Sequence, residues 1–188
     1  LTFNAEDSQW YTVRVSDGAK TNLTAKLGVR FDDESSDTPE PARAYGSAGW
    51  TSGDRSVLLY DKYDIWEVRP DGTDARLVTG GAGRKAQLVF RYVRTDPEER
   101  MFPSDKPFFL SAVNDVTKAT GFYRVTPTPA PPAPAARPAR GRTAPPAPAP
   151  LAAAYGEPVR LVMVEKRLAS PAGGGGPGGG GPGGGGGG

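Results

Sequence analysis

The sequence predicts an all-β protein, and three observations lead to this fold class. β-branched, aliphatic and aromatic residues gather in short runs, as is typical of strands. Turn-forming groups of Pro, Gly and Asp recur about every ten residues between these runs. No interval between the turns is long enough for an amphipathic helix of typical length.

The strand pattern is clearest in residues 50–79. Residues 56–60 and 63–69 read as strands, the second alternating polar residues with Ile65 or Trp66 and Val68. Turns are predicted at 52–54 and at Pro70-Asp71-Gly72, because Pro presets φ, Asp bonds its own following backbone and Gly accepts positive φ. Residues 75–79 return as a short strand. The segment therefore predicts a four-stranded antiparallel meander.

Related patterns lie on both sides of this meander. Residues 11–13, 17–18 and 23–24 repeat the spacing of 66–68, 71–72 and 77–79, with one extra residue before the first Asp-Gly. A more divergent unit follows, with strands expected at 86–94, 107–113 and 121–125 and polar breaks at 95–100 and 114–118. Repeats of tens of residues indicate propellers, solenoids or arrays, and strand-only units favour a β-propeller.

Composition divides the chain into four parts. Residues 1–125 are expected to form an incomplete β-propeller of about two to three blades. Residues 126–158 are rich in Pro, Ala and Arg and read as a disordered insert or linker. Residues 159–168 contain an isolated strand of the next blade, and residues 169–188 form a Gly-rich disordered tail.

The length of the foldable part is short for this architecture. Propeller blades contain about 40 to 45 residues, and closed propellers have roughly four to eight blades. An open stack leaves sheet faces uncovered and strand edges unpaired. We therefore expect a piece of a larger protein, or a chain that pairs with another one; the start at Leu1 instead of Met agrees with the first alternative.

Composition also narrows the chemistry. The chain has no histidine, which excludes a Ser-His-Asp or Cys-His hydrolase, a His-ligated metal and a His general base within it. The absence of cysteine excludes disulfides and thiolate metal sites, and leaves the compartment undetermined. The net charge of +2 is close to neutral, and no apolar run approaches the roughly 20 residues of a membrane span.

Several residue groups have both a possible functional role and a structural alternative. The acidic cluster Asp32, Asp33, Glu34 and Asp37 offers oxygen ligands for a hard cation, but a solvated loop is the favoured interpretation. Asp61 and Asp64 could act as paired carboxylates, but turn capping is favoured, because residues three apart in a strand point to opposite faces.

An aromatic set and a glycine-rich segment also have both a possible functional role and a structural alternative. The aromatic residues could stack nucleic-acid bases, but packing between sheets is favoured: Trp10, Trp50, Tyr60, Tyr63, Trp66 and Phe90. The glycine-rich residues 80–84 lack the Gly-Lys-Ser/Thr ending of a phosphate loop and a following helix, so they are predicted to form a turn between blades. No catalytic, cofactor-binding or metal-binding residue is expected.

The predicted meander resembles a known repeat. It is similar to the TolB-like propeller repeat in its turn residues, its Asp-Ile-Trp strand and the Asp-Gly that follows. The residues that carry this similarity are Trp50, Asp54, Asp61, Asp64, Trp66, Asp71 and Gly72. Residues 26–30, 45–50, 60–66, 90–91, 96–99 and 117–124 further resemble the propeller region of bacterial prolyl oligopeptidase family serine peptidases.

The resemblance implies a function for a larger protein. In that family a propeller precedes an α/β-hydrolase domain and admits peptides while excluding folded proteins; no residue here matches its catalytic triad. The chain is therefore expected to be a non-catalytic propeller fragment that gates or scaffolds peptide access. Its expected partners are the missing blades and the hydrolase domain, and peptides or a protein partner, with no nucleic acid. The alternative is a TolB-like module for protein–protein interaction, and a third possibility is an aggregation-prone fragment.

Overall fold

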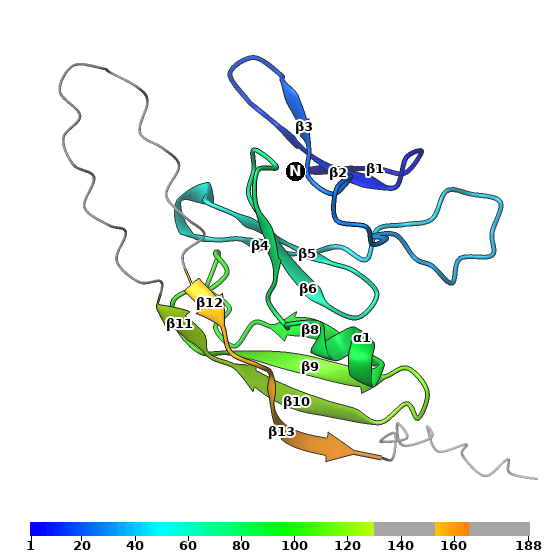
Figure 1. The fold of residues 1–188 in the computed structure, drawn as a ribbon, viewed down its shortest axis with the longest axis vertical. Helices are drawn as coiled ribbons and strands as arrows, with labels where there is room; N and C mark the ends of the chain where they lie inside the picture. The colour runs from blue at the N-terminus through cyan, green and yellow to red at the C-terminus, as the bar shows by residue number, and fades with distance from the viewer. Residues whose placement is uncertain (130–152, 166–188) are drawn as a thin grey trace, which may run out of the picture.

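The computed structural model describes residues 1–129 and 153–165. Within these residues the fold is all-β, as the sequence predicts, with a short 3-10 turn (η1, Ser52–Asp54) and a five-residue helix (α1, Ala82–Ala86). The main strands form three antiparallel sheets that follow one another along the chain as layers (Figure 1).

The first sheet has three short strands in the order β1-β2-β3. They are β1 (Thr2–Asn4), β2 (Gln9–Val13) and β3 (Lys20–Asn22). Phe3 and Trp10 lie opposite each other in the register and turn their rings toward the second sheet. A long connection then carries the chain to the second sheet, with one bridge between Asp32 and Ala44.

The second sheet is a four-stranded meander, as predicted, in the order β4-β5-β6-β7. Its strands are β4 (Ser47–Trp50), β5 (Val57–Tyr60), β6 (Ile65–Val68) and β7 (Ala75–Leu77). The first strand ends at Trp50, so the meander begins before the predicted segment. The register of β4 against β5 shifts between Ser47 and Gly49, and Gly49 has a φ of 111°, which suits such an irregularity.

The third sheet also has four strands, in the order β13-β10-β9-β8. They are β8 (Leu88–Val93), β9 (Phe108–Asn114), β10 (Thr120–Val125) and β13 (Val159–Val164). The first three match the strands expected from the sequence. The expectation of an isolated strand at 159–168 is corrected, because β13 pairs antiparallel with β10. Pairing across so long a connection has no local signal in the sequence.

The Pro-rich region 126–158 also differs in part from its prediction. Its two ends form a short antiparallel hairpin of β11 (Pro127–Pro129) and β12 (Ala153–Tyr155). Proline is tolerated there because a two-stranded ribbon has only edge strands. Residues 130–152, and the Gly-rich tail predicted at 169–188, lie outside the described residues.

The second sheet is buried on both faces. All four side chains of β5 are buried, and they alternate between two hydrophobic cores. Val57 and Leu59 pack toward the first sheet, and Leu58 and Tyr60 toward the third. The first core also contains Trp10, Leu23, Phe31 and Val68, and the second contains, among others, Ile65, Phe90, Phe102, Phe108, Leu110 and Tyr123. The three sheets therefore form a stack with the second sheet in the middle.

Candidate functional site

The residues that the sequence singled out lie in two places on the second sheet. Asp61, Asp64 and Trp66 lie at or beside the β5–β6 turn, where they make hydrogen bonds. Trp50, Asp54 and Asp71 line a pocket between the first two sheets. Gly72 follows Asp71 in the β6–β7 turn, where it contacts the first sheet. The structure thus separates the predicted set into a turn network and a pocket.

Asp61 caps the turn between β5 and β6, which is the role that the turn-capping interpretation predicted. One carboxylate oxygen accepts hydrogen bonds from the backbone N–H groups of Tyr63 and Asp64, each at 2.7 Å. The other accepts from Trp66 Nε1 at 2.9 Å and lies 3.6 Å from the guanidinium of Arg84. Asp61 is buried, and its oxygens are occupied by these donors.

Asp64 binds the start of α1. Its Oδ1 accepts from the hydroxyl of Thr79 at 2.6 Å and from the N–H of Gly83 at 2.9 Å, and its Oδ2 accepts from the N–H of Arg84 at 2.9 Å. A Cβ on Gly83 would lie only 2.7 Å from Asp64 Oδ1 and 2.6 Å from the carbonyl oxygen of Tyr63. The site therefore requires glycine there.

This arrangement corrects the prediction for residues 80–84. The sequence predicted a turn with no helix, whereas α1 begins at Ala82. The N–H groups at its start, which have no partner within the helix, donate to Asp64 instead of a phosphate, because a carboxylate suits the amino end of a helix in the same way. Asp61 and Asp64 both use their oxygens for backbone and side-chain donors, so they do not form an acid/base pair.

A third buried carboxylate, Glu67, was not singled out from the sequence. Its Oε2 accepts from the guanidinium of Arg76 at 2.6 and 2.9 Å and from the hydroxyl of Tyr155 at 2.9 Å. Its Oε1 accepts from the Ser56 hydroxyl. The Tyr155 ring also lies 4.8 Å from the Arg76 guanidinium, as in a cation–π contact. The sequence contains one signal for Glu67: it is a charged residue between Trp66 and Val68, inside a predicted strand. A glutamate in a strand that is buried on both faces needs partners for its carboxylate.

Glu67 also shifts the titration of Tyr155. Burial of the phenol, and then the neighbouring Glu67 carboxylate, raise the pKa of Tyr155 well above its usual range. The network links β6 and β7 to the hairpin strand β12, so its evident role is to hold β12 against the second sheet.

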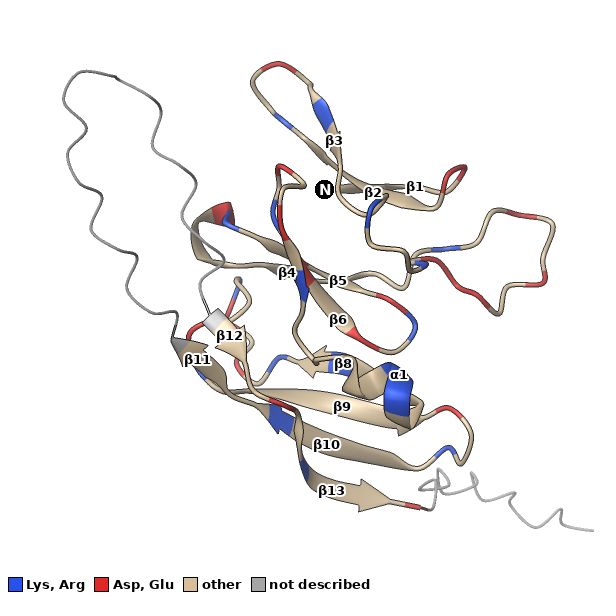
Figure 2. Ribbon diagram, in the orientation of Figure 1, with Lys and Arg blue, Asp and Glu red and all other residues tan. Residues whose placement is uncertain are grey.

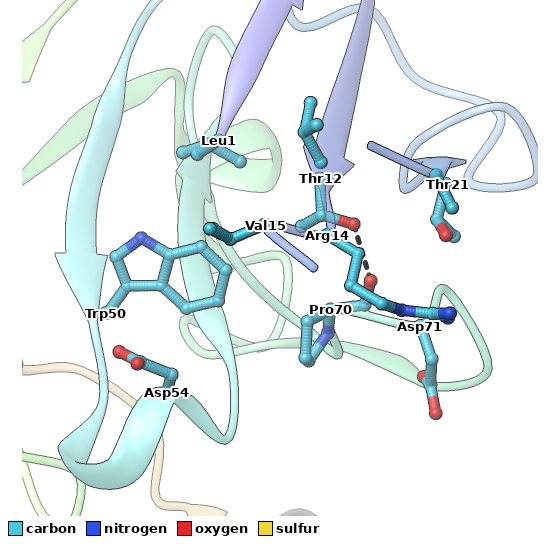
Figure 3. A pocket seen from close by; sticks show the side chains of 11 residues that line it. Leu1, Thr12, Arg14, Val15, Thr21, Trp50, Asp54, Pro70 and Asp71 are labelled. Atoms are coloured by element: carbon cyan, nitrogen blue, oxygen red, sulfur yellow. Dashed lines mark hydrogen bonds between the residues drawn. The ribbon is translucent and has the colours of Figure 1, made fainter. Parts of the chain in front are cut away.

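The pocket between the first and second sheets has a volume of about 630 Å³. Figure 3 shows the Trp50 ring and Asp54 on one side of it, with Pro70 and Asp71 on the other. Leu1, Val13 and Val15 add apolar surface. The pocket therefore joins apolar walls to a polar rim.

The polar groups of this pocket favour binding over catalysis. The Thr12 hydroxyl donates to the carbonyl oxygen of Pro70 at 2.6 Å, so it is not paired with a general base. Arg14 forms an ion pair with Asp17, with 3.0 Å between Arg14 Nη1 and Asp17 Oδ2. Asp71 accepts from the Thr73 hydroxyl in its own turn at 2.6 Å.

Gly72 explains how the second sheet approaches the first beside this pocket. Its φ is +68°, and a Cβ there would lie 2.9 Å from the carbonyl oxygen of Asn22 in β3. Only glycine allows both the left-handed conformation and this close approach.

In the acidic cluster, Asp32 and Asp33 make structural contacts, whereas Glu34 and Asp37 are exposed on the loop. Asp32 accepts from Arg30 at 2.6 and 3.0 Å and from Ser8, and the Arg30 guanidinium lowers the pKa of the Asp32 carboxyl. Asp33 accepts from the Ser35 hydroxyl, which lowers the pKa of Asp33. Within residues 1–129 and 153–165, no group of three His, Cys, Asp or Glu side chains is placed to hold a metal ion.

The aromatic residues do not form one platform. Trp10, Tyr60 and Phe90 are buried in the two cores, whereas Trp50, Tyr63 and Trp66 are half-buried. The packing interpretation therefore describes the first three well. For Trp66, an edge-to-face contact with Phe31 and the bond to Asp61 account for its position.

In the part of the chain that the structure describes, no helix is long and apolar enough to cross a membrane. Comparisons of the chain with protein-family models, with curated proteins and with solved structures found no match.

Proposed function

We propose that this chain is a non-catalytic part of a β-propeller, acting as scaffold or gate for peptide access to a prolyl oligopeptidase-like hydrolase domain. The observation that carries the propeller proposal is the division of β5 between two cores. Propeller blades are four-stranded antiparallel sheets that repeat radially, so an inner blade buries both of its faces. The second sheet has the strand number, order and two-sided burial of such a blade.

The third sheet supports the same proposal. It is again four-stranded and antiparallel, and its inner face packs on the second sheet through Leu58 and Tyr60. A short element joins the second and third sheets: α1 begins five residues after β7 and precedes β8. Repetition of one layer type along the chain is the property expected of a propeller or another stacked array.

The link to peptidases rests on the sequence resemblance. The residues that carry it, such as Asp61, Asp64 and Trp66, hold turns and α1 in place, which suits a scaffold. The chain has no histidine, and none of its residues matches the family's catalytic triad, so hydrolysis is assigned to a domain outside this chain. The partners are then further blades and that domain.

Two experiments test this proposal. First, the reading frame downstream of the coding sequence should encode a Gly-x-Ser-x-Gly turn followed by Asp and His; its absence in every frame would remove the peptidase link. Second, joining that hydrolase domain to this propeller should preserve cleavage of short proline-containing peptides and suppress cleavage of a folded protein with an exposed proline-containing loop. Equal cleavage of the folded protein with and without the propeller would contradict a gating role.

The chain alone serves as the control. It should not hydrolyse a chromogenic proline peptide, and it should not react with a fluorophosphonate probe of active serine hydrolases. Labelling of this chain would refute the non-catalytic assignment.

The alternative of a TolB-like interaction module is favoured by one observation, the pocket beside Trp50. A partly buried tryptophan in an apolar hollow with acidic residues on its rim is a common anchor for a partner side chain. If the downstream frame lacks a hydrolase while Trp50→Ala abolishes binding to a co-purifying protein, the interaction module is the better account.

A further inference from the structure

The first sheet repeats three of the four strands of the second sheet. The backbone N–H of Leu23, directly after β3, donates to the carbonyl oxygen of Trp10 in β2 at 2.8 Å. The N–H of Val78, directly after β7, donates to the carbonyl oxygen of Ile65 in β6 at the same distance. β2 therefore corresponds to β6, and Trp10 to Ile65.

Side-chain hydrogen bonds agree with this correspondence. The hydroxyl of Thr24 accepts from the backbone N–H of Trp10 at 3.0 Å. The hydroxyl of Thr79 accepts from the backbone N–H of Ile65 at 3.3 Å. All four residues are buried. The third strand of the first sheet, β3, thus corresponds to β7.

The first strand, β1, takes the place of β5. Residues 1–4 read Leu-Thr-Phe-Asn, and residues 58–61 read Leu-Leu-Tyr-Asp. The third residue of each run, Phe3 and Tyr60, lies opposite the corresponding residue of the next strand. The last residue of each run accepts a bond from the backbone N–H two positions later, at 3.3 Å and 2.7 Å. The first sheet therefore matches β5-β6-β7.

The strand that corresponds to β4 has no counterpart in the first sheet. β4 pairs with β5 in the second sheet, and β8 pairs with β9 at the edge of the third. Among the residues that the structure describes, β1 pairs only with β2. The first sheet therefore has a free edge at the position where each of the other two sheets has a further strand.

The edge of β1 also lacks the usual protection against pairing. Edge strands commonly carry charged residues, proline or a β-bulge, which discourage the addition of another strand. Thr2–Asn4 contains no charge and no proline, its register with β2 is regular, and Figure 2 shows this strand in tan. β3, at the opposite edge, carries Lys20. The edge of β1 is therefore the open one.

Val13 of β2 shows the effect of the unfilled position. Its counterpart Val68 is fully buried, whereas Val13 is 40% exposed. Val68 is paired with Val57 of β5, which is paired in turn with Trp50 of β4. Val13 instead lines the pocket of about 630 Å³, together with Leu1 and Trp50. The pocket thus lies at the end of the first sheet that corresponds to the β4–β5 turn.

We propose that the free edge of β1 binds an extended strand of the β4 type, which enters β1 through a turn in this pocket. Its source is the polypeptide directly before residue 1 in a longer protein, because β4 directly precedes β5 and β8 directly precedes β9. Main-chain hydrogen bonds supply the recognition, and small residues followed by an aromatic one, as in Ser47–Trp50, suit the site. The inference rests on the repeat between the sheets, and not on the peptidase link.

An extended form of the full chain tests this. A copy of residues 46–57 is placed directly before Leu1, so that the copied Val57 precedes Leu1 as Val57 precedes Leu58. The N–H groups of β1 that do not bond β2 should exchange at least about tenfold more slowly than in the unextended chain, because ladder hydrogen bonds protect them. Amide hydrogen exchange followed by NMR measures this.

A matched extension serves as the control. It has the same length, with Ser47→Pro and Gly49→Pro in the copy, at the two positions that face β5 in the original sheet. Proline cannot donate to a ladder, so this extension should leave the exchange of β1 unchanged.

A disulfide then tests the register. Ser47 is paired with Leu59, which corresponds to Thr2, so a thiol at the copied Ser47 should face Thr2→Cys. Paired residues of antiparallel strands have Cα atoms about 4.5 to 5.5 Å apart, within disulfide reach. The chain has no other cysteine. Oxidation should be at least about tenfold faster than with a thiol at the copied Ser52, although that residue is nearer to Thr2 in the sequence.

Three results would overturn the proposal. The first is equal exchange of β1 in the copied extension and in its proline control. The second is a slow exchange of β1 in the unextended chain, which would mean that another part of the chain already pairs with this edge. The third is an equal rate of oxidation for the two thiol pairs. Circular dichroism of each form confirms that folded chains are compared.

Discussion

The two faces of the second sheet are buried in different ways. Toward the first sheet, the core around Trp10 and Phe31 lies near the pocket of about 630 Å³. The buried Trp10 Nε1 has no hydrogen-bond partner among the residues that the structure describes. Toward the third sheet, the core is larger and rich in aromatic contacts, such as Phe102 with Phe108 at 4.7 Å between ring centroids.

Hydrogen bonds to buried carboxylates add to the difference between these two sheet contacts. On the side of the third sheet, Asp64 accepts hydrogen bonds from the start of α1, and Glu67 accepts one from Tyr155 of β12. A buried carboxylate whose oxygens are all bonded fixes one arrangement of its neighbours, whereas apolar contact beside a pocket leaves room for adjustment. We expect the contact between the second and third sheets to be the more rigid of the two.

The largest expected effect comes from truncating adjacent residues of β5. Leu58→Ala removes side-chain contacts toward the third sheet, and Leu59→Ala removes them toward the first. Both side chains are fully buried, so each variant should lose about 2 to 5 kcal/mol of unfolding free energy. Urea denaturation measures both, with Val116→Ala, on an exposed turn, as control. The rigidity argument predicts the larger loss for Leu58→Ala, and a larger loss for Leu59→Ala would contradict it.

Loss of the Asp64 carboxylate should be the next largest effect. Asp64→Asn replaces an oxygen that accepts N–H bonds with a donor, which leaves buried N–H groups of α1 unpaired. We expect a loss of about 1 to 3 kcal/mol in urea denaturation. Asp71→Asn is the matched control, because Asp71 bonds only Thr73 in its own exposed turn among the contacts that the structure describes. A similar loss in both variants would show that Asp64 has no special role.

On the other face, Gly72→Ala tests the close approach of the first sheet. The added Cβ meets the carbonyl oxygen of Asn22 at 2.9 Å, and the residue must keep a positive φ. We expect a loss of about 1 to 2 kcal/mol. Gly18→Ala has a similar positive φ of 71° with no atom within 4 Å, so it isolates the conformational part. Equal losses in the two variants would argue against the sheet contact.

The smallest effect concerns alkaline pH. The fold favours protonated Tyr155, so this stabilisation is present below the unfolded tyrosine pKa of about 10 and is lost as the pH rises above it. Thermal unfolding between pH 8 and 11 should show stability falling above about pH 10. Tyr155→Phe should weaken that fall without removing it, because burial also raises the pKa of Tyr92. An identical pH dependence in the variant would mean that Tyr155 is solvated.

The sequence predicted what is decided locally. The strands of the second and third sheets follow from short apolar runs and their turns, and Asp61 caps a turn two and three residues away. The features that it did not predict, α1 and the Glu67–Tyr155 hydrogen bond, depend on residues far apart in the sequence. α1 has only five residues and is held by Asp64, about twenty positions earlier, and Tyr155 reaches Glu67 across 88 positions.

The pocket and the pairing of β13 with β10 could not be predicted for the same reason. The sequence indicates Trp50 and Asp71 only as repeat residues, whereas the pocket forms because β2 and Leu1 lie beside them. β13 was predicted as a strand, but its neighbour β10 lies beyond a long Pro-rich segment. No local pattern specifies which strand pairs with it.

Thiol labelling tests the central claim, that the second sheet is buried on both faces, most directly. Leu58→Cys and Leu59→Cys each place one thiol in a chain without cysteine, on opposite faces of β5. Under native conditions both should react with a maleimide far more slowly than Val15→Cys, and denaturant should make all three equal. If either Leu58→Cys or Leu59→Cys reacts as fast as Val15→Cys in the folded chain, one face of the second sheet is open and the stacked arrangement is wrong.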